Sequence, residues 1–274
     1  MISIPDPHVH TRFCGHGSGA VTDMVRSAAA KGLPGVGFAE HFPYPAGFRH
    51  EIDDAVTPSD RWQAYVNDVL QAKQDFSGRI EVLLGAEADF IPEHASSIRD
   101  RLAQAPYDCV FGSVHLVRDV LIDYSESYLK DRLAALGGVR GLWAAYWDRV
   151  EQMVRSGFCD VVAHLDLPKK FKLSGPSPKD MERVGSILES IKAGDMTLEV
   201  NTGGIDRSDA GEPYPSFSIL KTAAEMQVDV LLGSDAHRPE EVGRHFHSTL
   251  TTLKALGFTQ LAVYRSRRKS YIAI

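Results

Sequence analysis

Histidine and acidic residues recur in this chain directly after short apolar segments. His8 and His10 follow the first such segment, and Asp235 and His237 follow the last. Imidazole and carboxylate groups are the side chains that bind divalent metal ions in proteins. The full set, with one histidine in a following loop, is His8, His10, His16, His41, Glu87, His115, His164, Asp235 and His237. This set is too large for one ion and sufficient for two or three ions that share carboxylates, so the sequence predicts a multinuclear metal site.

Two pairs of candidate ligands, His8 with His10 and Asp235 with His237, have a spacing that favours chelation, although neither pair is decisive alone. Side chains two residues apart on a strand point to the same face, so His8 and His10 can approach one ion. Asp235 and His237 repeat this spacing after Gly233, which lets the backbone come close to its neighbours. An isolated pair of this kind is as often a surface pair as a ligand pair. The prediction therefore depends on the joint occurrence of all the positions.

The apolar segments that precede these residues are predicted to be strands. Helical patterns separate them: one from a Thr22 N-cap to Gly32, one after Pro58, and one that opens at Ser177-Pro178. Two further amphipathic stretches cover residues 215–226 and 250–256. Strands that alternate with helices indicate βα units and a parallel sheet. The predicted strands occupy residues 2–5, 35–39, 80–84, 109–114, 160–163, 196–200 and 228–232.

Seven such units predict an α/β fold, a distorted barrel of the (β/α)7 type that is one unit short of a TIM barrel. Barrels of this kind carry their active residues at the C-terminal ends of the strands, where the candidate ligands fall. An open doubly wound sheet is the alternative, but it has no radial centre on which seven strand ends converge. No linker divides the chain, so residues 1–274 are predicted to form a single domain. The long connections 42–79 and 116–158 are candidates for a lid over the site.

Composition restricts the partners of this protein. The 274 residues carry a net charge of −6, with 24% charged and 43% hydrophobic residues, which is typical of a soluble globular protein. The acidic balance and the lack of a basic stripe argue against nucleic acid, and no run approaches the roughly 20 apolar residues of a membrane helix. Three widely spaced cysteines favour a reducing cytoplasm. Of these, Cys14 lies between His10 and His16, but cysteine is more often packed than coordinating.

The ordered motifs resemble those of the polymerase and histidinol phosphatase (PHP) family, and within it the monofunctional histidinol-phosphatases. The resemblance runs nearly from end to end. It implies a distorted seven-stranded barrel with a trinuclear centre of divalent ions, with zinc, iron or manganese as the candidates. The motifs are Asp6-Pro7-His8-Val9-His10-Thr11, Cys14-Gly15-His16-Gly17, Ala39-Glu40-His41, Gly85-Ala86-Glu87, Gly112-Ser113-Val114-His115, Ala163-His164, Glu199-Val200-Asn201-Thr202 and Gly233-Ser234-Asp235-Ala236-His237.

The resemblance also implies how the ligands divide among three ions. Glu87 would bridge the first two ions. The first ion would take His8, His10, Glu87 and Asp235, the second Glu87, His115 and His164, and the third His16, His41 and His237.

The expected reaction is hydrolysis of L-histidinol phosphate by a hydroxide that bridges two ions and attacks phosphorus. Asp235, His237 and Arg207 are the predicted catalytic residues, with Asp235 as ligand and as acceptor of the hydroxide proton.

Four side chains are predicted to contact the substrate. Arg207 and Lys169 offer positive charge to the phosphate, and Phe42 and Tyr44 offer an aromatic surface to the imidazole. No carboxylate for the substrate ammonium can be identified. The alternatives are another small phosphomonoester, a nucleotide phosphodiester, or a module of the same family without catalytic activity. The partner is therefore expected to be a small molecule, while the oligomeric state cannot be read from the sequence.

Overall fold

The computed structural model describes residues 3–52, 55–171, 173, 176–208 and 211–274. Within these ranges, a seven-stranded parallel sheet has the order β1-β2-β3-β4-β7-β8-β9. Its strands are almost entirely buried and rich in Val, Leu and Gly, as expected of strands covered on both faces. They are β1 (Asp6–Val9), β2 (Gly35–Phe38), β3 (Glu81–Asp89), β4 (Cys109–Ser113), β7 (Val161–Val162), β8 (Thr197–Asn201) and β9 (Val230–Gly233).

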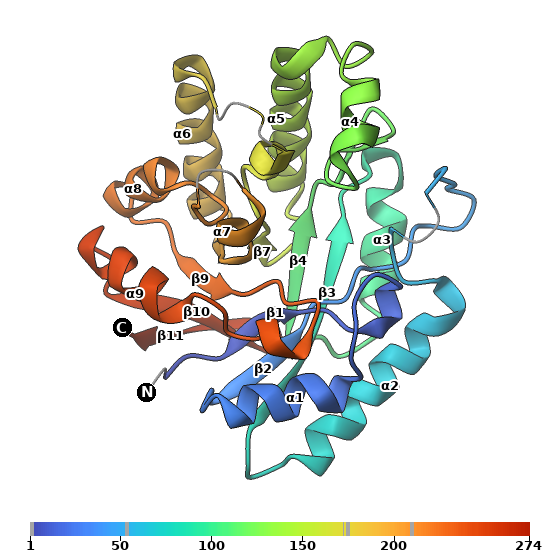
Figure 1. The fold of residues 1–274 in the computed structure, drawn as a ribbon, viewed down its shortest axis with the longest axis vertical. Helices are drawn as coiled ribbons and strands as arrows, with labels where there is room; N and C mark the ends of the chain where they lie inside the picture. The colour runs from blue at the N-terminus through green and yellow to red at the C-terminus, as the bar shows by residue number, and fades with distance from the viewer. Residues whose placement is uncertain (1–2, 53–54, 172, 174–175, 209–210) are drawn as a thin grey trace.

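The first and last strands of this sheet approach each other and nearly close it into a barrel (Figure 1). The amide of His10 donates to the carbonyl of Ala236 at 2.8 Å, and Val9 forms a parallel bridge with Ala236. At the start of β1, the buried carboxylate of Asp6 accepts hydrogen bonds from the amide and hydroxyl of Ser234. The distorted seven-stranded barrel that the sequence predicts is confirmed.

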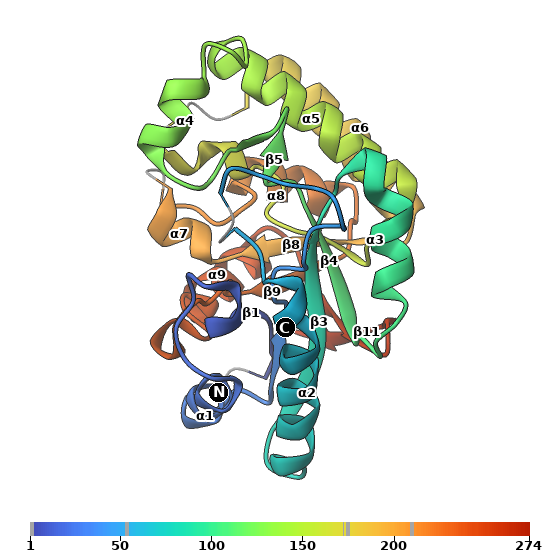
Figure 2. The same cartoon turned by 90° about the vertical axis from the view of Figure 1, so that its right-hand side faces the viewer.

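Helices surround the strands (Figure 2). The capping box predicted at Ser177 is present, because its hydroxyl accepts the amide of Asp180 while its own amide donates to the Asp180 carboxylate. The predicted start of the first helix is wrong: the helix begins at Val21, because the Asp23 carboxylate receives the amide of Ala20. The helices are α1 (Val21–Ala30), α2 (Ser59–Asp75), α3 (Ala95–Leu102), α4 (Glu126–Arg132), α5 (Gly138–Ser156), α6 (Pro178–Ala193), α7 (Gly203–Arg207), α8 (Phe217–Glu225) and α9 (Phe246–Ala255).

Short elements follow several strand ends and shape the region above the barrel. A small hairpin of β5 (Leu116–Val117) and β6 (Val120–Leu121) leaves β4 and leads into α4. Both long connections predicted from the sequence thus contain regular structure, with α2 in the first and β5, β6, α4 and α5 in the second. The 3-10 turns are η1 (Arg12–Cys14), η2 (Pro92–His94), η3 (Leu167–Phe171) and η4 (Pro239–Glu241).

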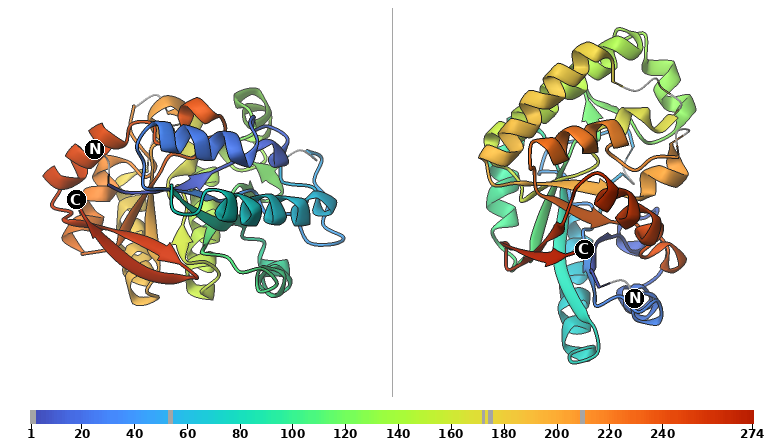
Figure 3. Two further views of the ribbon diagram at one scale, coloured as in Figure 1. Left: turned by 90° about the horizontal axis from the view of Figure 1, so that it is seen from below. Right: turned by 90° about the vertical axis from the view of Figure 1, so that its left-hand side faces the viewer.

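A C-terminal hairpin that the sequence reasoning did not anticipate lies against the opposite, N-terminal ends of the strands (Figure 3). It consists of β10 (Gln260–Arg265) and β11 (Arg268–Ala273). Ser266 and Arg267 both have positive φ, as a two-residue turn between antiparallel strands requires. The hydroxyl of Tyr264 lies 2.8 Å from that of Thr197, at the start of β8.

Candidate metal centre

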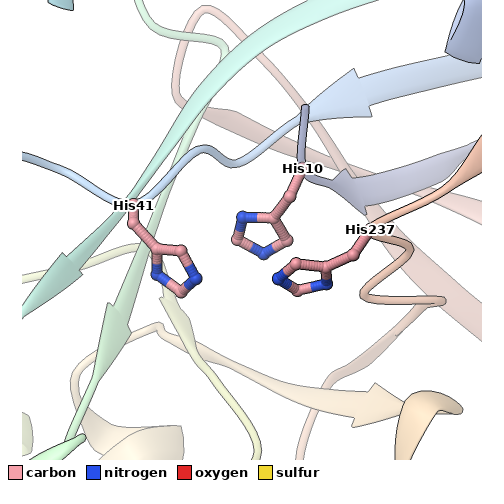
Figure 4. A group of neighbouring side chains, drawn as sticks. All are labelled: His10, His41 and His237. Atoms are coloured by element: carbon pink, nitrogen blue, oxygen red, sulfur yellow. The ribbon is translucent and has the colours of Figure 1, made fainter. Parts of the chain in front are cut away.

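The C-terminal ends of the strands bring the nine predicted ligands together at one rim of the barrel. His8 belongs to β1, Glu87 to β3, and His115 is the second residue after β4. Figure 4 shows how His10, His41 and His237, from three different segments, turn their rings toward a common space. The rings of His10 and His237 stack at 4.2 Å between centroids. Because the strands are parallel, they bring together side chains such as those of His10 and His237, which lie more than 200 residues apart in sequence.

Glu87 lies at the centre of this arrangement, almost fully buried. Its Oε2 atom faces one group of imidazoles, at 3.0 Å from Nδ1 of His41, 3.6 Å from Nε2 of His10 and 3.7 Å from Nε2 of His8. Nε2 of His10 also lies 3.2 Å from Oδ1 of Asp235.

The second oxygen of Glu87 faces a different group. Its Oε1 atom lies 2.8 Å from Nε2 of His164 and 3.6 Å from Nε2 of His115. A carboxylate whose two oxygens face separate sets of nitrogens has the arrangement of a bridging ligand.

A further group of ligands adjoins the first. The ring of His16 lies 5.1 Å from that of His41 and 5.0 Å from that of His237, measured between centroids. The Cys14 sulfur is also near: its thiol, with one nitrogen each of His16 and His237, forms a group within 4.8 Å. Burial and the charge of Glu40 raise the pKa of the Cys14 thiol, which therefore remains protonated.

Carboxylates behind the rim hold the imidazoles in one orientation. Nδ1 of His8 is hydrogen-bonded to Glu199, and Nδ1 of His10 lies 3.3 Å from Oε1 of Glu40. Each Nδ1 then carries the proton, and each Nε2 keeps a lone pair for a metal ion. The two Nε2 atoms are 3.0 Å apart and face one small space beside Glu87. Two imidazole nitrogens and a carboxylate around one space suit a divalent cation, so the donor set fits a metal ion.

The pKa shifts of the rim residues also bear on metal binding. Burial raises the pKa of Glu87, but His41 and His115 outweigh it and hold that pKa well below its ordinary value. Burial also opposes ionisation of Asp235, yet Arg207 holds its pKa well below the usual range. Burial and His10 lower the pKa of His41 to about 4, which leaves this imidazole neutral. Burial lowers the pKa of His115, but Asp89 and Glu87 raise it to about 10, so this imidazole would release a proton when it binds a metal ion.

A cavity of about 380 Å³ opens on this rim. Arg207, predicted from the sequence, lines it: Nη1 lies 2.5 Å from Oδ2 of Asp235, and Nη2 lies 3.2 Å from Nδ1 of His237. Asp235 has a φ of 51°, in the left-handed region, and its carbonyl accepts hydrogen bonds from Arg207 and Arg244, each at 3.1 Å. The residues that line the cavity beyond the candidate ligands are Ala55, Asp89, Leu121, Asp123, Tyr124, Leu167, Lys170, Arg207, Tyr214, Arg238 and Glu241.

Comparison with known proteins identifies the family. Residues 6–203 match the model of the PHP domain. The chain belongs to the PHP family. A protein of Deinococcus radiodurans named "Probable histidinol-phosphatase" is 33% identical over 261 residues, which cover 94% of this chain and 95% of that protein. The histidinol-phosphatase of Bacillus subtilis is 28% identical, with 89% of this chain and 97% of that protein covered.

A solved PHP structure shares the fold. Histidinol phosphate phosphatase from Lactococcus lactis subsp. lactis, complexed with zinc, L-histidinol and phosphate, superposes with a TM-score of 0.78 at 23% identity. The match covers 98% of this chain and 100% of that chain. The overall barrel of this PHP chain is therefore that of a known phosphatase structure.

Three of the predicted substrate contacts lie away from the cavity of this PHP barrel. Lys169 is buried, with Nζ at 3.0 Å from Oδ2 of Asp166 and 2.6 Å from the carbonyl of Pro213. The next residue, Lys170, lines the cavity instead, because the 3-10 turn η3 directs successive side chains to different sides.

The predicted aromatic contacts pack elsewhere. Phe42 is buried against Trp62, at 4.8 Å between ring centroids, and lies under the guanidinium of Arg101. The ring of Tyr44 packs against that of Phe48 at 4.9 Å between centroids, tilted by 59°. Neither is among the described residues that line the cavity. The apolar wall there is formed by Leu121, Tyr124 and Leu167, which the sequence reasoning missed.

Two acidic residues of the site were also missed. Glu199 holds His8, and Asp89 lies 3.1 Å from Nδ1 of His115 and accepts its amide at 2.8 Å. A pattern that could have revealed Asp89 is its spacing from Glu87, because residues two apart on β3 share a face.

Proposed function

We propose that this chain is a metal-dependent phosphatase that hydrolyses L-histidinol phosphate to L-histidinol and inorganic phosphate. The observation that carries the proposal is the position of Glu87, whose two oxygens face two different groups of histidines on the floor of the cavity. The relatives named histidinol-phosphatase align over nearly their whole length, which supports the substrate.

The nine rim residues would hold three divalent ions. His8, His10, Glu87 and Asp235 suit the first, and His115, His164 and Glu87 the second. His16, His41 and His237 suit the third, and His41 lies 3.0 Å from Glu87. Such ions polarise phosphoryl oxygens and make water a nucleophile near neutral pH. The zinc in the Lactococcus structure favours zinc here, with iron and manganese as alternatives.

Arg207 and Asp235 are the groups of the chain placed to act on the phosphoryl group. The Arg207 guanidinium lines the cavity and keeps its charge, since Asp235 raises its pKa although burial lowers it. A guanidinium offers parallel donors that match two phosphoryl oxygens. Asp235 Oδ2 contacts Arg207 while Oδ1 faces His10, so this carboxylate is positioned to hold a proton between the rim and the cavity.

The part of the cavity wall beside α4 suits the leaving group. Leu121 and Tyr124 form an apolar surface there, with the carboxylate of Asp123 between them in sequence. Burial disfavours the charge of Asp123, but Lys170 and His115 hold its pKa below the ordinary value, so it stays ionised. Lys170 already contacts this carboxylate, with Nζ at 3.3 Å from Oδ2, and the substrate ammonium would share it. We assign Asp123 to the ammonium, a role that no residue could be given from the sequence.

A panel of substrates tests the proposal. Purified enzyme with measured metal content is assayed on histidinol phosphate, p-nitrophenyl phosphate, AMP and a dinucleotide. We expect kcat/KM to be at least about 100-fold higher for histidinol phosphate, roughly 2.7 kcal/mol of transition-state preference. Equal values for all the compounds would contradict the assignment. A preference for AMP or the dinucleotide would support the alternative of another phosphomonoester or a phosphodiester.

A further inference from the structure

Tyr214 occupies a fixed position in the cavity wall that neither the metal ligands nor the predicted substrate contacts use. Only 1% of its surface is exposed to solvent, and it lines the cavity. Its amide donates to the carbonyl of Asn201 at 2.9 Å, and its carbonyl accepts the amide of Asn201 at 2.6 Å. Because Asn201 ends β8, this bridge ties Tyr214 to the barrel itself. The ring is therefore held by the same framework that positions the rim.

The hydroxyl of Tyr214 has no hydrogen-bond partner among the described residues. Buried tyrosine hydroxyls usually have one, because an unpaired polar group inside a protein opposes folding. The hydroxyl of Tyr146 donates to the carbonyl of His164, and that of Tyr65 donates to the carbonyls of Phe38 and Gly85.

Two other tyrosines in the described part of the chain also have a buried hydroxyl without a hydrogen-bond partner. They are Tyr44 and Tyr128, and neither lines the cavity. Tyr214 is thus the tyrosine of the described residues that combines an unpaired hydroxyl with a place in the cavity wall.

The surroundings of Tyr214 determine what the hydroxyl can do. Burial raises the pKa of its phenol, and the carboxylates of Asp166, Asp123 and Asp235 raise it further, while Arg207 acts in the opposite direction. The phenol therefore stays protonated and can donate a hydrogen bond. The Nζ atom of Lys169 lies 5.0 Å from the ring centroid, but this ammonium is paired with Asp166. A protonated phenol beside the guanidinium of Arg207 is a suitable donor to an anion.

The location within the cavity selects the phosphoryl group over the leaving group. The ring of Tyr214 is 6.5 Å from the ring of His164, a candidate metal ligand, and its phenol interacts electrostatically with Arg207. Asp123, which we assign to the leaving group, also interacts with the phenol, but Arg207 is the strongest charged neighbour. Tyr214 therefore lies beside Arg207 and close to a candidate metal ligand, where the phosphoryl group would bind.

We infer that Tyr214 is a catalytic residue whose hydroxyl donates a hydrogen bond to a non-bridging phosphoryl oxygen, beside the guanidinium of Arg207. The inference depends on the proposed phosphatase function, because it requires a phosphate ester in the cavity. No bond of the tyrosine forms or breaks. The hydroxyl stabilises negative charge on the phosphoryl group, a contribution that any phosphomonoester would receive.

The test is Tyr214→Phe, which keeps the ring and removes the donor. We expect kcat/KM to fall about 10- to 100-fold for both histidinol phosphate and p-nitrophenyl phosphate, since a hydrogen bond to a charged group is lost. Inhibition by inorganic phosphate should weaken as well, and bound metal should remain at the wild-type level. The matched control is Tyr264→Phe, which removes a buried tyrosine hydroxyl beside Thr197, outside the cavity, and should leave both substrates unaffected.

Three outcomes would overturn the inference. One is a change of less than twofold on both substrates, another is a loss confined to histidinol phosphate, and the third is a loss that parallels metal release. The p-nitrophenyl phosphate assay separates this inference from the proposed substrate. If the wild-type enzyme showed no preference for histidinol phosphate, the substrate proposal would fail while Tyr214 could still be tested on the simpler ester.

Discussion

The two ends of the barrel use charged residues in opposite ways. At the N-terminal ends of the strands, acidic residues pair with cations of the C-terminal hairpin. Arg265 reaches Glu81 at 2.7 Å, and Nε of Arg267 lies 2.9 Å from Oδ2 of Asp160. At the C-terminal ends, in contrast, Glu87 lies among several imidazoles and is almost fully buried.

This difference indicates which charges serve folding and which serve a ligand. The pairs of the hairpin are partly exposed, and each charge has its counter-charge in the same chain. At the rim, side chains that accept metal ions face one another, and two imidazole Nε2 atoms are 3.0 Å apart. Paired charges hold the hairpin to the barrel, whereas the rim gathers histidine and carboxylate side chains that could hold metal ions.

Removal of the bridging carboxylate should have the largest effect. In Glu87→Gln, an amide that carries no charge replaces the group that faces both sets of histidines. We expect kcat to fall about 1000-fold, roughly 4 kcal/mol, because charge stabilisation by the metal ions is lost. Elemental analysis should show less bound metal in the same sample. Wild-type metal content together with more than a tenth of the activity would show that Glu87 does not bridge.

The carboxylates behind the rim should have a smaller effect. Glu199→Gln keeps the size of the side chain but weakens its contact with Nδ1 of His8. We expect metal affinity or activity to fall about 10- to 100-fold, the usual consequence of losing a group that orients a ligand. Titration with a competing chelator measures the affinity. Glu189→Gln on the exposed side of α6 is the control, and an equal effect of both substitutions would refute an orienting role for Glu199.

The comparison also explains what the sequence could predict. Each predicted strand is an apolar run that ends in a candidate ligand or, at residues 196–200, in Asn201, and this pattern locates six of the seven barrel strands together with the rim. The first strand was predicted at residues 2–5 but is β1 (Asp6–Val9), because the strand contains the polar segment that carries His8. Parallel strands point the same way, so their C-terminal ends necessarily meet. Residues such as His8 and Asp235 could therefore be grouped without coordinates, although they lie at opposite ends of the chain.

The sequence pattern could not predict features that depend on contacts between distant segments. Lys169 and Lys170 are adjacent, and only the turn η3 decides which of them reaches the cavity. The hairpin β10–β11 was missed because its outer strand, Arg268–Ala273, carries no continuous apolar run and is stabilised by pairing with distant acids. Phe42 was placed at the substrate by its aromatic character alone, whereas packing against Trp62 determines its position.

The leaving-group side of the cavity should show an effect on one substrate only. Asp123→Asn removes the negative charge that we assign to the substrate ammonium. We expect kcat/KM for histidinol phosphate to fall about tenfold, as for a lost hydrogen bond to a charged group, and p-nitrophenyl phosphate, which has no ammonium, to change less than twofold. Asp131→Asn on the exposed face of α4 is the matched control. An equal loss on both substrates would place Asp123 in the phosphate site rather than the leaving-group site.

The smallest effect is expected at the opposite end, and it should appear in stability alone. Arg267→Ala removes a guanidinium whose Nε and Nη2 both contact Asp160, at the start of β7. Because the arginine side chain is 43% exposed, the pair should contribute about 1 kcal/mol or less to the free energy of unfolding. Urea denaturation measures this loss, which should shrink in concentrated salt as exposed charges are screened.

In the same variant, kcat and metal content should not change, because Asp160 lies at the N-terminal end of its strand and the candidate ligand His164 follows the other end. A fall in kcat without a fall in stability would mean that the two ends of the barrel are coupled, and that the division between folding charges and ligand charges is wrong.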